Sequence, residues 1–168
     1  FGIKKYMYAK YRKFDFISSK RITDLEQIEM DNVRLISGNS HPQLAKKISS
    51  ILNVPLVDTD VQYFSNTEIR PEIKESIRGR DIYIIQTGTF TNIKSHRSVN
   101  DHIMETLLLV KTCKRSDVKS ITLVMPCYPY ARQDKKDNPR GAISGKDVAD
   151  FFEGASAKIK SDQADAVR

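Results

Sequence analysis

Apolar and polar residues begin to alternate in regular blocks at Val33. Short apolar runs bounded by polar or glycine-containing segments predict buried strands. We expect them at the start of VRLISGNS, which ends in a Ser-Gly-Asn-Ser turn, and at 81–86 and 121–125. Gly79 supplies the turn before the second run. The segments VPLVDTDVQYF and TEIRPEI are also predicted to be extended. Pro71 marks the latter as an edge strand or a bulge, because proline donates no ladder hydrogen bond.

The segment HPQLAKKISSILN predicts a helix after the first strand. Ser40 is the expected N-cap, and Pro42 falls near the first turn, where its missing N–H costs little. Four apolar residues recur at helical spacing in it: Leu44, Ile48, Ile51 and Leu52.

Two further helices are predicted later in the chain. The segment NDHIMETLLLVKTCKRS predicts a mostly apolar helix with four residues set around it: Ile103, Leu107, Val110 and Lys111. The segment ISGKDVADFFE predicts a helix that Ser144 caps and on which Lys146 and Asp147 are exposed.

This order of strands and helices predicts an α/β fold, a mostly parallel sheet with helices on both faces. In such sheets, ligands bind beyond the carboxyl ends of the strands. The segment PCYPYARQDKKDNPRG lies at that end of the strand 121–125, so we expect chemistry there.

The charged segment suits a polyphosphate. Arg132 offers a planar fork of donors for phosphate oxygens, and three more cations follow it closely: Lys135, Lys136 and Arg140. Asp134 and Asp137 would hold Mg²⁺ or its waters, accept from an adenine amino group or orient the arginines. Two alternatives stay open: a solvated loop laced with salt bridges, and a single-stranded nucleic-acid surface on which Tyr128 and Tyr130 stack bases.

A second candidate segment is YFSNTEIRPEI. Phe64 could stack on a base, Asn66 offers both a donor and an acceptor, and Glu68 could accept from an amine or a ribose hydroxyl. On residue types alone, a plain strand and turn is the favoured interpretation. The three histidines are candidate metal ligands or bases. His41 favours a helix-start role. Neither His96 nor His102 has a partner at a metal spacing, apart from Glu105 beside His102. Neither a P-loop motif nor GxGxxG occurs.

Composition and charge narrow the class of partner. The 168 residues suit one domain, and a net charge of +7 favours anionic partners. Cys113 and Cys127 have no zinc spacing and predict a reduced chain, and no apolar run predicts a membrane span or a signal peptide. We expect a cytoplasmic location.

Five segments in one order make the chain resemble the ribose-phosphate pyrophosphokinases, or phosphoribosyl pyrophosphate synthetases. They are SGNSHPQLAKKI, FSNTE, ESIRGRDIYIIQTG, NDHIMETLLLV and PCYPYARQDKKD. The resemblance covers about Val33 to Phe152 and corresponds to the first half of that family's chain, whose N-terminal domain has a phosphoribosyltransferase-like fold.

The resemblance implies transfer of pyrophosphate from MgATP to the 1-hydroxyl of ribose 5-phosphate, which gives phosphoribosyl pyrophosphate and AMP. It implies a homo-oligomer, with a hexamer expected for the parent enzyme, and neither a membrane nor a nucleic acid as partner. The implied ATP-binding residues, of which the first three would embrace adenine at a neighbouring subunit's site, are Phe64, Asn66, Glu68, Arg132, Gln133, Asp134, Lys135, Lys136 and Asp137. The implied regulatory phosphate residues are Ser76, Arg78 and Arg140.

Departures from the family define the expected domain limits. We expect an N-terminal extension at 1–32, the ATP-binding domain at 33–152 and a tail at 153–168 that does not match the family, which indicates a truncation or a discontinuity. The loop 87–100 is also longer than in close relatives. Neither the family's catalytic loop nor its metal-binding histidine and aspartate occur here, so no catalytic or metal residue is expected and the chain alone should be inactive. The alternative is a non-catalytic, synthetase-associated regulatory subunit.

Overall fold

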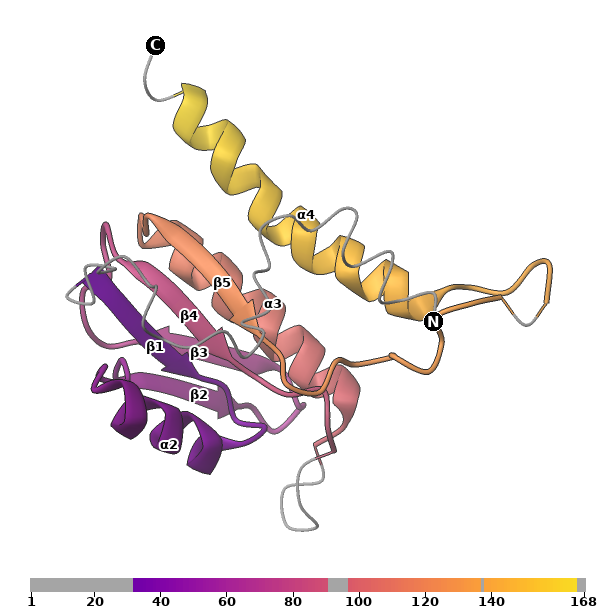
Figure 1. Cartoon of the computed structure of the whole chain (residues 1–168), viewed down its shortest axis with the longest axis horizontal. Coiled ribbons are helices and arrows are strands. Elements are labelled where there is room, and N and C mark those ends of the chain that lie inside the picture. Colours follow the sequence, from indigo (N-terminus) through magenta and orange to yellow (C-terminus); the bar gives the residue numbers. More distant parts are fainter. Residues whose placement is uncertain (1–31, 91–96, 137, 166–168) are drawn as a thin grey trace.

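A three-stranded parallel sheet forms the centre of the protein (Figure 1). The computed structural model describes residues 32–90, 97–136 and 138–165, with side chains described as far as residue 155. The strand order is β1 (Val33–Ser37), β4 (Asp81–Ile85) and β5 (Ser120–Val124), so the segment predicted at 81–86 is the central strand. Both neighbouring pairs are parallel, which confirms the predicted fold class.

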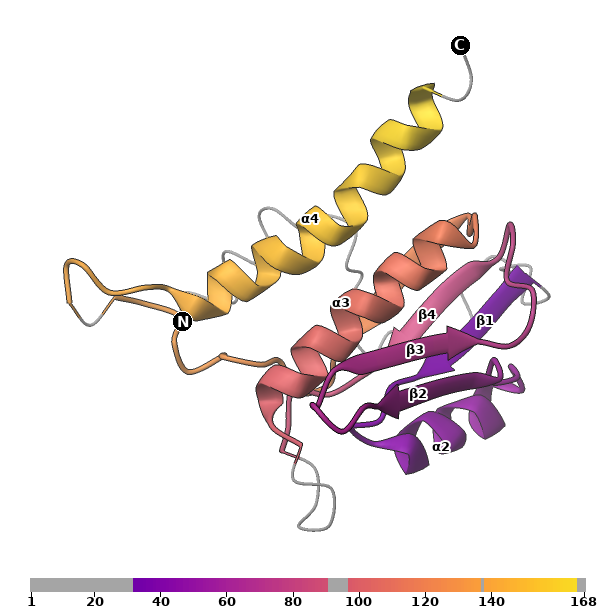
Figure 2. The same cartoon turned by 180° about the vertical axis from the view of Figure 1, so that it is seen from behind.

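A separate antiparallel ribbon joins β2 (Thr59–Tyr63) to β3 (Ile69–Ile73). In its register Val61 lies opposite Pro71. A ribbon of two strands consists only of edge strands, so Pro71 occupies the edge position that its missing donor predicts. Figure 2 shows the ribbon beside α3 (Val99–Arg115), against which β3 packs.

The sheet has helices on both faces, as predicted. Side chains alternate between the two faces of a strand, and on β4 Ile82 and Ile84 join one core cluster whereas Ile85 joins the other. The first cluster contains Leu109 of α3. The second contains Ala45 of α2 (Pro42–Leu52).

The start of α2 differs from the prediction. His41, not Ser40, is the N-cap, and its Nδ1 accepts a hydrogen bond of 3.2 Å from the Leu44 N–H. Ser40 is instead buried, and its Oγ accepts from the Thr87 N–H at 2.7 Å. The helix-start role expected for His41 is confirmed; the capping role of Ser40 is wrong because its hydroxyl serves the end of β4.

The face that α3 buries is partly polar. A reciprocal capping box of Ser98 and Asp101 starts the helix. The buried residues are His102, Glu105, Thr106, Leu109, Val110 and Cys113, whereas Ile103, Leu107 and Lys111 are only half-buried. Three of the six buried residues are polar, so an apolar stripe alone places this helix wrongly.

Two smaller differences concern β5 and α4. β5 spans 120–124 rather than 121–125, and every residue in it is half-buried rather than buried. The helix α4 (Ser144–Asp165) begins at Ser144 itself, and the Ile143 carbonyl accepts from the N–H groups of Lys146 and Asp147. Both of these side chains are exposed, as predicted.

Candidate functional site

The charged segment forms a loop between β5 and α4. Figure 1 shows it projecting away from the carboxyl end of the sheet. The polar heads of the predicted ATP-binding run are open to solvent: Arg132, Gln133, Lys135 and Lys136 are exposed and Asp134 is half-buried. Asp137 lies outside the described residues. The fold therefore presents a group of cations at the carboxyl end of the strands, where α/β sheets bind ligands.

Two tyrosine hydroxyls fasten this loop to the body. Tyr128 donates to the Gly145 carbonyl at 3.0 Å, and Tyr130 donates to the Asn100 Oδ1 at 2.6 Å. Tyr130 has a φ of 56°, and its carbonyl accepts from the Gln133 N–H at 2.9 Å. These contacts fix the start of the loop and leave the cations beyond it exposed.

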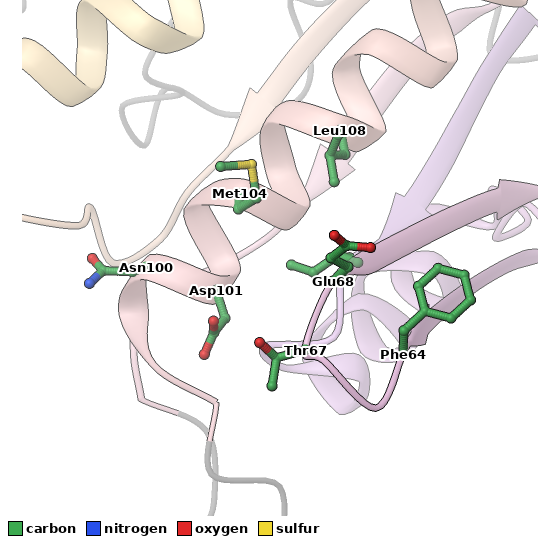
Figure 3. A pocket seen from close by; sticks show the side chains of 8 residues that line it. Phe64, Thr67, Glu68, Asn100, Asp101, Met104 and Leu108 are labelled. Carbon is green, nitrogen blue, oxygen red and sulfur yellow. The ribbon is translucent and has the colours of Figure 1, made fainter.

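A groove of about 560 Å³ separates the β2–β3 turn from the first turns of α3 (Figure 3). Phe64 and Glu68, two of the predicted adenine residues, line one wall, and Asn100, Asp101 and Met104 line the other. The Phe64 side chain is 49% exposed. Asn66 lies in the same turn and is exposed, so the three predicted residues share one surface element.

A buried carboxylate on α3, Glu105, was not among the predicted site residues. Glu105 is 0% exposed. Its Oε1 accepts from the Asn39 N–H at 2.7 Å, its Oε2 accepts from the Tyr63 hydroxyl at 2.9 Å, and His102 Nδ1 lies 3.7 Å from Oε2. The available signal was a His-x-x-Glu spacing on the face of α3 that ought to be apolar.

The predicted regulatory residues do not come together within one chain. Ser76 and Arg78 are exposed and precede β4, and Arg78 pairs with Asp117 at 3.0 Å. Arg140 is exposed and follows the carboxyl end of β5. Because β4 and β5 are parallel, the residues before β4 and the residue after β5 lie at opposite ends of the strands.

Across the described residues, no three His, Cys, Asp or Glu side chains are grouped as metal ligands. His96, a candidate metal ligand in the sequence, lies outside those residues. No helix in the described part of the chain has both the length and the apolar character needed to cross a bilayer.

Comparison with known proteins identifies the family. The model of the N-terminal domain of ribose phosphate pyrophosphokinase matches residues 33–155. Ribose-phosphate pyrophosphokinase 4 of Saccharomyces cerevisiae is 43% identical over 132 residues, which cover 79% of this chain and 39% of that protein. Ribose-phosphate pyrophosphokinase 2 of the same yeast is 46% identical over 125 residues, 74% of this chain and 38% of that protein.

The fold agrees with a solved structure. The phosphoribosylpyrophosphate synthetase of Mycobacterium smegmatis matches with a TM-score of 0.66 and 36% identity, over 74% of this chain and 39% of that one. The chain thus spans about two fifths of the length of the relatives that it matches. It belongs to the ribose-phosphate pyrophosphokinase family.

Proposed function

We propose that this chain is the ATP-binding half of an enzyme that transfers pyrophosphate from MgATP to the 1-hydroxyl of ribose 5-phosphate. The products are phosphoribosyl pyrophosphate and AMP. The observation that carries this proposal is the exposed run of cations at the carboxyl end of β5, in a chain that belongs to this family.

In this proposal the charged loop binds the triphosphate of MgATP, which enters as a substrate complex. Arg132 matches phosphate oxygens with its planar fork, while Lys135 and Lys136 act as point charges. When the ribose hydroxyl oxygen attacks the β-phosphorus and the bond to the α-phosphate oxygen breaks, negative charge is redistributed over the phosphates. Cations already in place stabilise that charge, so the loop contributes position and electrostatics rather than covalent chemistry.

The adenine ring is bound by a different element. Phe64 supplies an aromatic face, and Asn66 and Glu68 supply hydrogen-bonding groups beside it. In this proposal the turn serves a neighbouring copy's nucleotide, as the resemblance to the family implies, so the complete site would be shared between two chains. The regulatory phosphate site proposed for Ser76, Arg78 and Arg140 would likewise need a second copy. In one chain these residues lie at opposite ends of the strands of the sheet.

The test is calorimetric titration of MgATP into the complete polypeptide that carries this chain, beside an assay for AMP formed from ATP and ribose 5-phosphate. Arg132→Ala should weaken MgATP binding by roughly tenfold or more, because it removes hydrogen bonds to a charged ligand. Arg115→Ala is the matched control, since Arg115 is exposed at the far end of α3. The absence of MgATP uptake by the wild type would refute the proposal, and uptake without turnover would favour the non-catalytic subunit.

A further inference from the structure

Glu105 links α3 to two other elements of the fold. Its side chain is fully buried, so substrate does not reach it. Its carboxylate, on the second turn of α3, accepts hydrogen bonds from Asn39, in the turn after β1, and from Tyr63, the last residue of β2. A fully buried carboxylate is costly unless it is well hydrogen-bonded, and removing one partner leaves that cost uncompensated. The positions of these elements relative to one another are therefore coupled through one side chain.

Tyr63 is held on two sides. Its hydroxyl donates to Glu105, and the guanidinium of Arg97 lies 3.6 Å from the centroid of its ring. Burial raises the pKa of Tyr63 well above its usual range, and the nearby Glu105 charge raises it further. The hydroxyl consequently remains a proton donor at neutral pH, as its hydrogen bond to Glu105 Oε2 requires.

The turn that follows Tyr63 is closed by its own hydrogen bonds. Phe64 N–H donates to the Glu68 carbonyl at 2.9 Å, Thr67 N–H donates to the Phe64 carbonyl at 2.9 Å, and Glu68 N–H donates to the Asn66 Oδ1 at 3.2 Å. Such a turn moves as one unit. Where it points therefore depends on how its base is fixed to the rest of the protein.

The ribbon that carries the turn needs such an anchor. An isolated two-stranded ribbon is marginally stable in water, so its direction is set by packing against a larger body. β3 packs on α3, and Val61 of β2 packs against the hydrophobic core. Two hydrogen bonds also hold β2: the Tyr63 hydroxyl donates to Glu105, and the Asn39 Nδ2 donates to the Val61 carbonyl at 3.3 Å. The Tyr63 contact is the closer of these two to the turn.

We propose that Glu105, acting through the Tyr63 hydroxyl, is a positioning residue that aims the Phe64–Glu68 turn at the adenine base. Glu105 touches no ligand; it determines how well the turn discriminates adenine from other bases. This inference rests on the proposed function, because it assigns the turn to adenine recognition.

Tyr63→Phe tests the inference in the complete polypeptide, because it deletes the hydroxyl and keeps the ring beneath Arg97. The KM for ATP, and the Kd for a non-hydrolysable MgATP analogue, should rise by up to roughly tenfold, the order expected for the loss of one hydrogen bond. The value of kcat should change little, and the preference for ATP over GTP should shrink. In a Glu105→Gln background the same substitution should have a much smaller effect, because the two residues act as one unit.

Tyr83→Phe is the matched control, since Tyr83 packs in the core cluster between β4 and α2. A purely structural role would lower the melting temperature and kcat of Tyr63→Phe and leave KM and the ATP-to-GTP preference unchanged, which would overturn the inference. Unchanged kinetics and binding would overturn it as well, while the proposed function stood. A wild type that takes up no MgATP would overturn both, and that result is visible before any variant is made.

Discussion

The two cysteines of this chain lie in opposite surroundings. Cys113 is 0% exposed in the core formed by β4 and α3, and Cys127 is exposed just beyond β5. Burial raises the pKa of the Cys113 thiol to about 12. A buried thiolate has no solvent to stabilise it, so the folded protein retains this proton at a pH where the unfolded chain has lost it.

This difference predicts a loss of stability in alkali. Below about pH 9 the thiol is protonated in both states and its contribution is complete. As the pH rises from about 9 towards about 12, only the unfolded chain releases the proton, so the free energy of unfolding falls by up to about 1.4 kcal/mol per pH unit. Urea unfolding at several pH values should show a shallower decline for Cys113→Ala than for the wild type. Cys127→Ser should decline as the wild type does, and equal slopes in all three proteins would contradict the prediction.

Local chemistry explains for which residues the sequence alone predicts exposure or burial correctly. The exposure of Arg132, Lys135 and Lys136 follows from their charge and from a loop composition that no strand or helix tolerates. Glu105 could not be placed in the same way. Its partners Asn39 and Tyr63 are 66 and 42 residues away in the chain, and only the packing of α3 against the ribbon brings them within hydrogen-bond distance.

The segment that follows β4 and the loop that follows β5 lie unusually close to each other. A Cβ added at Gly88 would lie 2.5 Å from the Pro129 nitrogen and 2.7 Å from its Cα, and the Gly88 N–H donates to the Cys127 carbonyl at 2.7 Å. Backbone atoms cannot swing aside as a flexible side chain does. The position therefore requires glycine for space, and this contact sets where the charged loop begins.

Gly88→Ala should therefore destabilise the protein and displace the charged loop. We expect a loss of about 1–3 kcal/mol in the free energy of unfolding, the usual cost of overpacking, and weaker MgATP binding. Gly154→Ala is the control: Gly154 is exposed in α4 with no atom within 4 Å of an added Cβ, so alanine should stabilise the helix by up to about 1 kcal/mol. Urea unfolding of both variants checks the signs, and a neutral Gly88→Ala would show that the loop is free to move.

The sequence predicts these elements with uneven success for a physical reason. A buried central strand such as β4 is apolar on both faces, so its pattern needs no knowledge of its neighbours. α3 buries polar residues, among them Glu105, whose hydrogen-bond partners are distant in the chain, and a hydrophobic stripe cannot reveal this. The half-buried state of β5 likewise depends on how the rest of the fold covers this strand, which no short segment encodes.

For the whole molecule, the two candidate halves of a nucleotide site belong to separate surfaces. The charged loop projects from the end of β5, and the groove with Phe64 lies between the β2–β3 turn and α3 (Figures 1 and 3). In one chain, Tyr130 and Asn100 connect the two regions, but the loop between β5 and α4 extends away from the sheet. A site shared between copies would use both surfaces without any change in the fold.

Subunit complementation tests this arrangement in the complete polypeptide. Phe64→Ala should impair base binding and Arg132→Ala should impair phosphate binding, so each pure variant should turn over poorly. If the turn of one copy serves the loop of the next, a mixed pair has one site with both defects and one with neither. Random pairing makes about half of the dimeric units mixed, so activity should return to about a quarter of the wild-type value. If each chain completed its own site, every site would retain one defect, and coexpression would restore nothing above the mean of the two variants.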